Sequence, residues 1–173
     1  LNVGYDKHYN FAAHISLSAE IASTVKQLGI EINTTVLLHT IALFWDFCSF
    51  LLLTYLAILI AGKRAALTTA LCYALLPLAV QSSHYARPDT LLGFQAVLVL
   101  FCAYCMLRPQ NSRGFYSISV LTGLLIGAAT ATKASGIIYG IVPMAIFSYL
   151  LVSCQQSFKT LLLAGSGLLL ACV

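Results

Sequence analysis

The sequence predicts an all-α protein, a polytopic bundle of transmembrane helices with five complete spans and one partial span. Of its 173 residues 60% are apolar and only 8% are charged, and the mean hydropathy is +0.92. A soluble domain carries roughly 25% charged residues. So few charges cannot cover the surface of a soluble fold. The composition therefore excludes an ordinary soluble domain, a disordered chain and a nucleic-acid-binding protein, and it makes membrane lipids the expected surroundings.

The first 35 residues are polar and mixed, and we expect them to form the end of an extracytoplasmic loop. Between residues 14 and 29 apolar side chains recur at helical spacing, with polar side chains between them. Gly29 is a suitable residue to end such a helix. This pattern predicts a short amphipathic helix at the outer membrane interface, followed by a transmembrane region over residues 36–173.

The transmembrane region alternates long apolar runs with short polar breaks. The runs cover approximately residues 36–61, 65–80, 90–107, 115–131, 137–153 and 160–173. A span takes about 20 residues, with a range of roughly 17–25. The first run exceeds this length, the next four lie near the lower limit, and the sixth ends with the sequence. We therefore expect a piece of a longer protein, truncated at both ends.

The charges in the polar breaks predict an orientation. One side of the membrane carries basic residues without acidic neighbours, namely Lys63, Arg64, Arg108, Arg113 and Lys159. The opposite side carries a balanced set, namely Lys7, Lys26, Arg87 and Lys133 with Asp6, Glu20, Glu31 and Asp89. The positive-inside rule places the first set in the cytoplasm. We therefore expect a multi-pass membrane protein in which residues 1–35 and the breaks at 81–89 and 132–136 share the outer face.

Two of the outer breaks hold residues that can be interpreted in two ways. Pro88 and Asp89 suit the first turn of a helix, and Lys133 with Gly136 suits a helix end. Structural roles as caps or interfacial anchors therefore account for these residues. Alternatively, Arg87 beside a helix N-terminus and Lys133 at the same membrane surface are suited to bind a lipid phosphate.

A second candidate site lies inside the first apolar run. His39 and Asp46 are seven residues apart and share one helix face. Asp46 lies about 15 Å below the outer end of the run, near the middle of the membrane. Ionisable groups at that depth often mark an ion or substrate pathway, and the alternative is a protonated acid bonded to a neighbouring helix. This leaves open an alternative function, a transporter or lipid flippase with His39 and Asp46 on its pathway.

Three segments, in this order, carry a resemblance to a known family. Residues 62–67 read GKRAAL, residues 84–92 read HYARPDTLL, and residues 123–136 read GLLIGAATATKASG. In content, order and separation they resemble the GT-C membrane glycosyltransferases, in the branch of the protein O-mannosyltransferases and the lipid A aminoarabinose transferase. The resemblance covers roughly residues 36–153.

This resemblance implies an enzyme that moves a sugar from a polyprenyl-phosphate donor to an acceptor outside the cytoplasmic membrane. The resemblance also implies that the configuration at the anomeric carbon inverts and that prenyl phosphate is the leaving group. The implied substrate-binding residues are Arg87, Asp89, Lys133, His84, Tyr85, Lys7 and His8. A divalent metal, Mg or Mn, is also implied, with Asp89 as its candidate ligand. The sequence leaves the sugar, the acceptor and the prenyl length open.

The chain departs from the family in one important respect. The acidic Asp-Glu pair that supplies the family's general base occurs nowhere in it. Asp6 is the one acidic residue early enough in the chain to be considered for that role. We therefore expect the main base and the first transmembrane helix to lie upstream of Leu1, and we expect this piece to be inactive alone.

Overall fold

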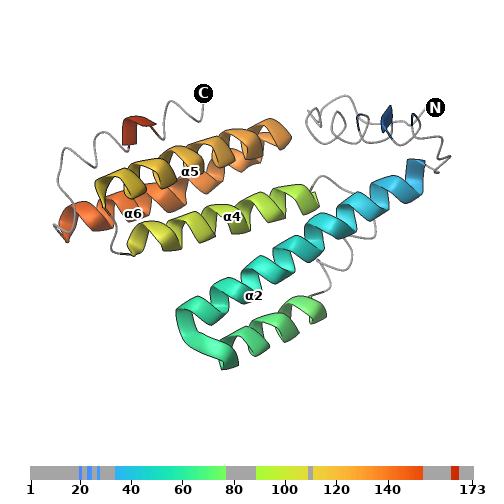
Figure 1. Ribbon diagram of the computed structural model, residues 1–173, viewed down its shortest axis with the longest axis horizontal. Helices are drawn as coiled ribbons and strands as arrows, with labels where there is room; N and C mark the ends of the chain where they lie inside the picture. The colour runs from blue at the N-terminus through green and yellow to red at the C-terminus, as the bar shows by residue number, and fades with distance from the viewer. Residues whose placement is uncertain are drawn as a thin grey trace.

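The computed structural model describes residues 20, 23–24, 27, 34–76, 89–108, 111–153 and 165–167 (Figure 1). Its main elements are α2 (Thr34–Leu75), α4 (Asp89–Leu107), α5 (Ser112–Thr132), the 3-10 helix η1 (Ala134–Gly140) and α6 (Ile141–Val152). These described residues include no strand. Four helical segments are long and apolar enough to cross a membrane, namely Val36–Leu75, Asp89–Leu107, Ser112–Thr132 and Ala134–Val152. The predicted all-α membrane fold is confirmed.

Helix α2 is a hairpin of two arms, residues 34–61 and residues 63–75. Gly62 joins them with φ 84° and ψ −174°, a conformation outside the helical region. Glycine reaches it easily because it has no Cβ. Figure 1 shows the chain reversing direction at this bend. The sequence analysis separated two apolar runs here, at residues 61 and 65, and the structure places the break between them.

Helices α4 and α5 run antiparallel, and their bounds agree with the predicted runs to within three residues. Asn111 begins α5, because its side-chain oxygen accepts a hydrogen bond from the backbone N–H of Gly114 at 2.8 Å. Such a cap satisfies one of the free N–H groups at the start of a helix. Because α5 begins only a few residues after α4 ends, the end of α4 and the start of α5 lie at the same end of the bundle (Figure 1).

The run predicted at residues 137–153 begins earlier than expected, with η1, and continues as α6. Gly136 was expected to stop α5 as a C-terminal glycine, and this expectation was wrong. Helix α5 ends at Thr132, Lys133 is extended with φ −157°, and Gly62 is the one described glycine with positive φ. Gly136 serves close packing instead, since an added Cβ would lie 2.4 Å from the carbonyl carbon and oxygen of Ala129. The chain therefore folds back tightly on α5.

An apolar cluster joins the last three helices at the end where α4 leads into α5. It consists of Ala103, Met106, Phe115, Ile146 and Leu150. The ring of Phe115 is fully buried and meets Phe147 edge to face, with 5.8 Å between the ring centroids. Edge-to-face packing of this kind adds to the energy of burial. The cluster fixes α4, α5 and α6 against one another at this end.

The first arm of α2 packs on α4 through aromatic side chains. Trp45 lies 5.1 Å from Phe94 between ring centroids, and Tyr55 lies 6.3 Å from Phe101. Near the bend, the hydroxyl of Tyr104 donates a hydrogen bond to the backbone carbonyl of Leu59 at 3.1 Å. A carbonyl beside an interrupted helix needs such a partner in a membrane, where water cannot supply one.

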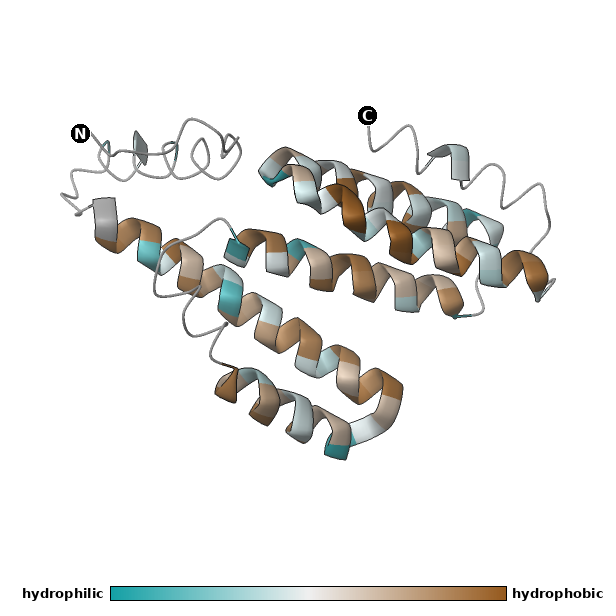
Figure 2. Ribbon diagram, turned by 180° about the vertical axis from the view of Figure 1, so that it is seen from behind, coloured by the Kyte–Doolittle hydropathy of each residue, from teal (hydrophilic) through white to brown (hydrophobic). Residues whose placement is uncertain are grey.

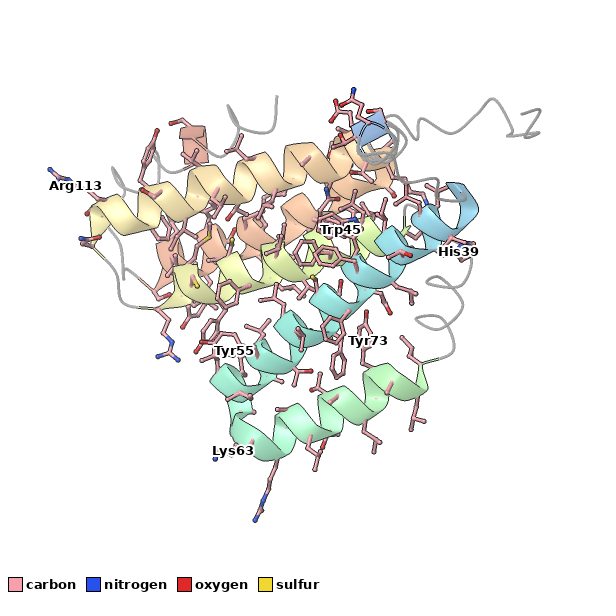
Figure 3. The ribbon with its side chains drawn as sticks, turned by 45° about the vertical axis from the view of Figure 1, so that its right-hand side comes forward. His39, Trp45, Tyr55, Lys63, Tyr73 and Arg113 are labelled. Carbon is pink, nitrogen blue, oxygen red and sulfur yellow. The ribbon has the colours of Figure 1, made fainter. Side chains whose placement is uncertain are left out.

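The outer surfaces of the helices are largely apolar, as expected for contact with lipid. Figure 2 shows white to brown along most of the bundle, with teal at the start of α4 and at the α2 bend. Basic residues mark the same end as the bend: Figure 3 shows Lys63 and Arg113 away from His39, which lies toward the opposite end. Arg108 also belongs to the end with the bend, since its guanidinium hydrogen-bonds Tyr104.

The structure describes only parts of the two terminal predictions. Of the predicted amphipathic helix, Glu20, Ser23, Thr24 and Gln27 are described, and they are helical and exposed. The hydroxyls of Ser23 and Thr24 both donate to the carbonyl of Glu20. Of the run at 160–173, residues 165–167 are described and are helical. The remaining residues of both segments lie outside the described part of the chain.

Candidate functional site

An ion pair joins two motifs that the sequence analysis singled out separately. Lys133 Nζ lies 2.9 Å from Asp89 Oδ1, although the two residues are 44 positions apart in the chain. Asp89 is the first residue of α4, and Lys133 directly follows the last residue of α5. The antiparallel arrangement of these two helices brings both residues to one end of the bundle (Figure 1). We refer to the pair as the Asp89–Lys133 pair.

Both charges occupy helix ends that favour them. The carboxylate of Asp89 lies in the first turn of α4, where the helix dipole is positive. Lys133 follows α5, where the dipole is negative, and its backbone N–H donates to Ala129 at 2.9 Å. Each side chain of the pair is 38% exposed. A ligand arriving at this end of the bundle can therefore reach the ammonium group, which has three hydrogen bonds to donate.

A layer of polar contacts lies next to the pair, further along α4. Gln95 Nε2 donates to Thr132 Oγ1 at 3.3 Å, and Thr132 Oγ1 donates to the carbonyl of Ala128 at 2.9 Å. The hydroxyl of Tyr139 in η1 donates to the carbonyl of Leu92 at 3.4 Å. Gln95 is 8% exposed and Thr132 1%. These contacts hold the end of α5 and, through Tyr139, the later part of η1 against α4.

The sequence analysis missed this layer, although a signal for it was present. Gln95 is the one amide side chain in the apolar run 90–107. Polar side chains inside a membrane span usually face other helices and find partners there. Applied to Gln95, that rule would have predicted an interhelical contact. It could not have identified Thr132 as the partner, because that depends on how α4 and α5 are aligned.

The described residues do not by themselves form the predicted metal site. They include no group of three or more His, Cys, Asp or Glu residues that could hold a metal ion. The carboxylate of Asp89 is engaged by an ammonium group at 2.9 Å, and a divalent cation on the same carboxylate would meet a like charge. The divalent metal therefore stays a prediction, and no step below depends on it.

Most of the other predicted site residues lie outside the described part of the chain. They are Arg87, His84, Tyr85, Lys7, His8 and Asp6. Arg87 precedes Asp89 by two positions, so the chain itself keeps it near the start of α4. Its proposed contact with phosphate stays a prediction, as do the roles of the other five residues.

The candidate site inside the first arm of α2 has a different character. Asp46 Oδ1 accepts a hydrogen bond from the hydroxyl of Tyr73, in the second arm, at 2.7 Å. The ring of Tyr73 also lies 5.7 Å from that of Phe50. Figure 3 shows Tyr73 pointing from the second arm toward the first. Asp46 thus links the two arms of α2. This contact gives the half-buried Asp46 a structural role, which is independent of the pathway interpretation of His39 and Asp46.

The fold and the site together define a polytopic helical membrane protein with a charged pair at one end of its bundle. Comparison with protein families shows that residues 14–173 match the family described as dolichyl-phosphate-mannose-protein mannosyltransferase. The chain belongs to this family, which is one of membrane glycosyltransferases of the GT-C type. The predicted resemblance is therefore confirmed. Comparison with curated proteins finds no match, and neither does comparison with solved structures.

Proposed function

We propose that the protein transfers a sugar of the mannose type from a polyprenyl-phosphate donor to an acceptor on the extracytoplasmic face of the cytoplasmic membrane. We further propose that Lys133 binds the phosphate of the donor, together with Arg87. The observation that carries this proposal is the Asp89–Lys133 pair. The pair joins two of the segments that resemble the family, residues 84–92 and 123–136, at one end of the bundle. The family membership supports the reaction class.

The chemistry of the transfer explains why cations are needed at this place. The bond between the anomeric carbon and the phosphate oxygen breaks, and a bond from the anomeric carbon to the acceptor oxygen forms. The acceptor proton passes to a base, for which Asp6 is the candidate in this sequence. Negative charge develops on the departing phosphate oxygen. A fixed ammonium group beside that oxygen lowers the barrier, because it interacts most strongly with the charge formed in the transition state.

Asp89 has a separate task in this proposal. The ammonium group of Lys133 lies at the end of a flexible four-carbon side chain. Without a partner it would sample many positions. The carboxylate at 2.9 Å holds the ammonium at the end of the bundle before the donor arrives. With Arg87 nearby, the three groups carry a net charge of +1, so the site still attracts an anion.

A purely structural ion pair would have the same geometry, and a charge swap distinguishes the two roles. The double variant Asp89→Lys with Lys133→Asp keeps an ion pair between α4 and α5. We expect sugar transfer to fall by roughly a hundredfold or more in Lys133→Ala, which is the order found when one stabilising donor is removed from a transition state. We expect the double variant to stay equally impaired, because the ammonium no longer lies where Lys133 places it.

The measurement is the initial rate of sugar transfer from a polyprenyl-phosphate sugar by the full-length enzyme, in membranes containing equal amounts of each variant. Lys133→Arg serves as the matched control, since it keeps the positive charge, and we expect it to retain more activity than Lys133→Ala. Parent-like transfer by the charge-swapped variant would show that the pair is only structural. Parent-like transfer by Lys133→Ala would remove Lys133 from the phosphate site.

A further inference from the structure

We infer that Gln95 is a positioning residue for Lys133: through Thr132 it sets where the ammonium group meets the donor phosphate. The inference rests on the proposed function of Lys133. Gln95 touches neither the charged pair nor, in this proposal, the substrate. It acts on the backbone that carries Lys133.

The contacts define a short mechanical connection. Gln95 Nε2 donates to Thr132 Oγ1 at 3.3 Å, and Thr132 is bonded directly to Lys133. Helix α5 ends at Thr132, and Lys133 is extended with φ −157° and ψ 132°. The backbone therefore leaves α5 at Lys133, the residue whose ammonium group has to be positioned. The Gln95 contact fixes the last residue before that departure.

Helix α4 supplies both fixed points. Asp89 and Gln95 are six residues apart, which is about 9 Å along a helix. Asp89 holds the ammonium of Lys133, and Gln95 holds the side chain of Thr132, the residue before it. Between them, the carbonyl of Leu92 accepts from Tyr139, near the end of η1, and so ties that 3-10 helix to α4 as well. Lys133 is thus held from α4 at its ammonium group and through the side chain of the residue before it.

Packing alone does not explain a glutamine at this position. Its side chain is 8% exposed in an apolar run, and Oε1 has no hydrogen-bond partner among the described residues. A buried acceptor without a partner is costly, and an apolar side chain of similar size would avoid that cost. A role of Gln95 Nε2 in positioning Lys133, through Thr132, would account for an amide side chain at this position.

Substitutions at Thr132 test the connection with little change in volume. Thr132→Val removes the hydroxyl that accepts from Gln95, and Thr132→Ser keeps it. Interhelical hydrogen bonds in membrane proteins change equilibria by roughly three- to twentyfold. We expect Thr132→Val and Gln95→Leu each to weaken binding of a synthetic polyprenyl phosphate by a factor in that range, and Thr132→Ser to bind like the parent. Ser119→Ala is the matched control, because Ser119 is equally buried in α5 and bonds only its own helix, at the carbonyl of Phe115.

The decisive readout is a double-mutant cycle on the dissociation constant of polyprenyl phosphate, measured with the intact protein in detergent micelles. If Gln95 acts through Lys133, Gln95→Leu weakens binding in the parent but has no further effect in Lys133→Ala. Trp45, the single tryptophan of the chain, packs on Phe94 beside Gln95 and reports by its fluorescence whether α2 and α4 remain packed.

The outcomes separate this inference from the proposed function. Equal losses from Gln95→Leu in both backgrounds would assign Gln95 a general structural role and overturn the inference. Binding by Thr132→Ser as weak as by Thr132→Val would also overturn it, and so would parent-like binding by Gln95→Leu. Unchanged binding and transfer in Lys133→Ala would instead defeat the proposed function, on which the inference rests.

Discussion

The charges of Asp89 and Lys133 contribute little to the stability of the fold. Each side chain is more than a third exposed, and exposed ion pairs contribute about 0–1 kcal/mol. Their favourable positions at two helix ends add a similarly small amount. Substitutions at this pair should therefore leave the bundle folded. A loss of transfer in such variants can then be attributed to the site itself.

The hydrogen bond between Tyr73 and Asp46, in contrast, is expected to stabilise the fold and to have little effect on sugar transfer. It joins the two arms of α2 at a half-buried position. We expect Tyr73→Phe, which removes the donor, to lower the free energy of unfolding by about 0.5–2 kcal/mol, the range for such bonds in membrane proteins. We expect a smaller loss in Asp46→Asn, because the amide oxygen can still accept from Tyr73. Thermal unfolding in micelles and the rate of sugar transfer measure the two effects separately. Loss of transfer in Asp46→Asn with unchanged unfolding would favour a proton or ion pathway instead.

The residues of the site were only partly predictable from the sequence. Asp89 and Lys133 stand in recognisable motifs at breaks on the same side of the membrane, so both could be named. The direct contact between them could not be predicted, because it depends on the rotation of α4 and α5 about their axes. The same is true of the bonds from Gln95 to Thr132 and from Tyr73 to Asp46. Partners on different helices are determined by packing, which local patterns do not contain.

At the scale of elements, the turn after α5 depends on Gly136. An added Cβ there would lie 2.4 Å from the backbone of Ala129, a distance that real Cβ atoms do not show. Since backbone atoms cannot yield as a flexible side chain can, Gly136→Ala must push η1 away from α5. We expect a loss of about 1–3 kcal/mol in the free energy of unfolding, as for other overpacked sites, together with weaker donor binding.

Gly140 provides the control for this prediction. It lies in the same 3-10 helix, and an added Cβ there would have nothing within 4 Å. We expect Gly140→Ala to unfold and bind donor like the parent. Chemical denaturation of both variants in micelles checks the difference. If Gly136→Ala were as stable as Gly140→Ala, the close approach of η1 to α5 would be contradicted.

The elements themselves could be predicted because their signal is local. Each apolar run forms a helix where the structure describes it, and the described break at Gly62 forms a bend. The exception is η1, since the run was expected to begin at residue 137 and to form an ordinary helix. Hydrophobic periodicity over so few residues does not distinguish a 3-10 helix from an α-helix. The close packing of Gly136 on Ala129 was likewise not predictable, because it is a contact that only the folded chain shows.

At the scale of the whole molecule, the two ends of the bundle have different compositions. One end holds the apolar cluster around Phe115, the α2 bend, and the basic residues Lys63 and Arg113 (Figure 3). The other holds the Asp89–Lys133 pair with its layer of polar contacts. An apolar cluster fixes the helices at one end, and polar contacts align them at the other. This division leaves the second end accessible to a charged ligand.

The central claim is that sugar transfer takes place at the end of the bundle that holds the Asp89–Lys133 pair. The most direct measurement compares the initial rate of transfer by the full-length enzyme in Arg87→Ala and Arg113→Ala, with membrane insertion checked for both. The two variants remove the same charge, one beside the pair and one at the opposite end. We expect Arg87→Ala to lose transfer by roughly a hundredfold or more and Arg113→Ala to retain it. Retained transfer in Arg87→Ala with loss in Arg113→Ala would place the reaction at the other end and contradict the account.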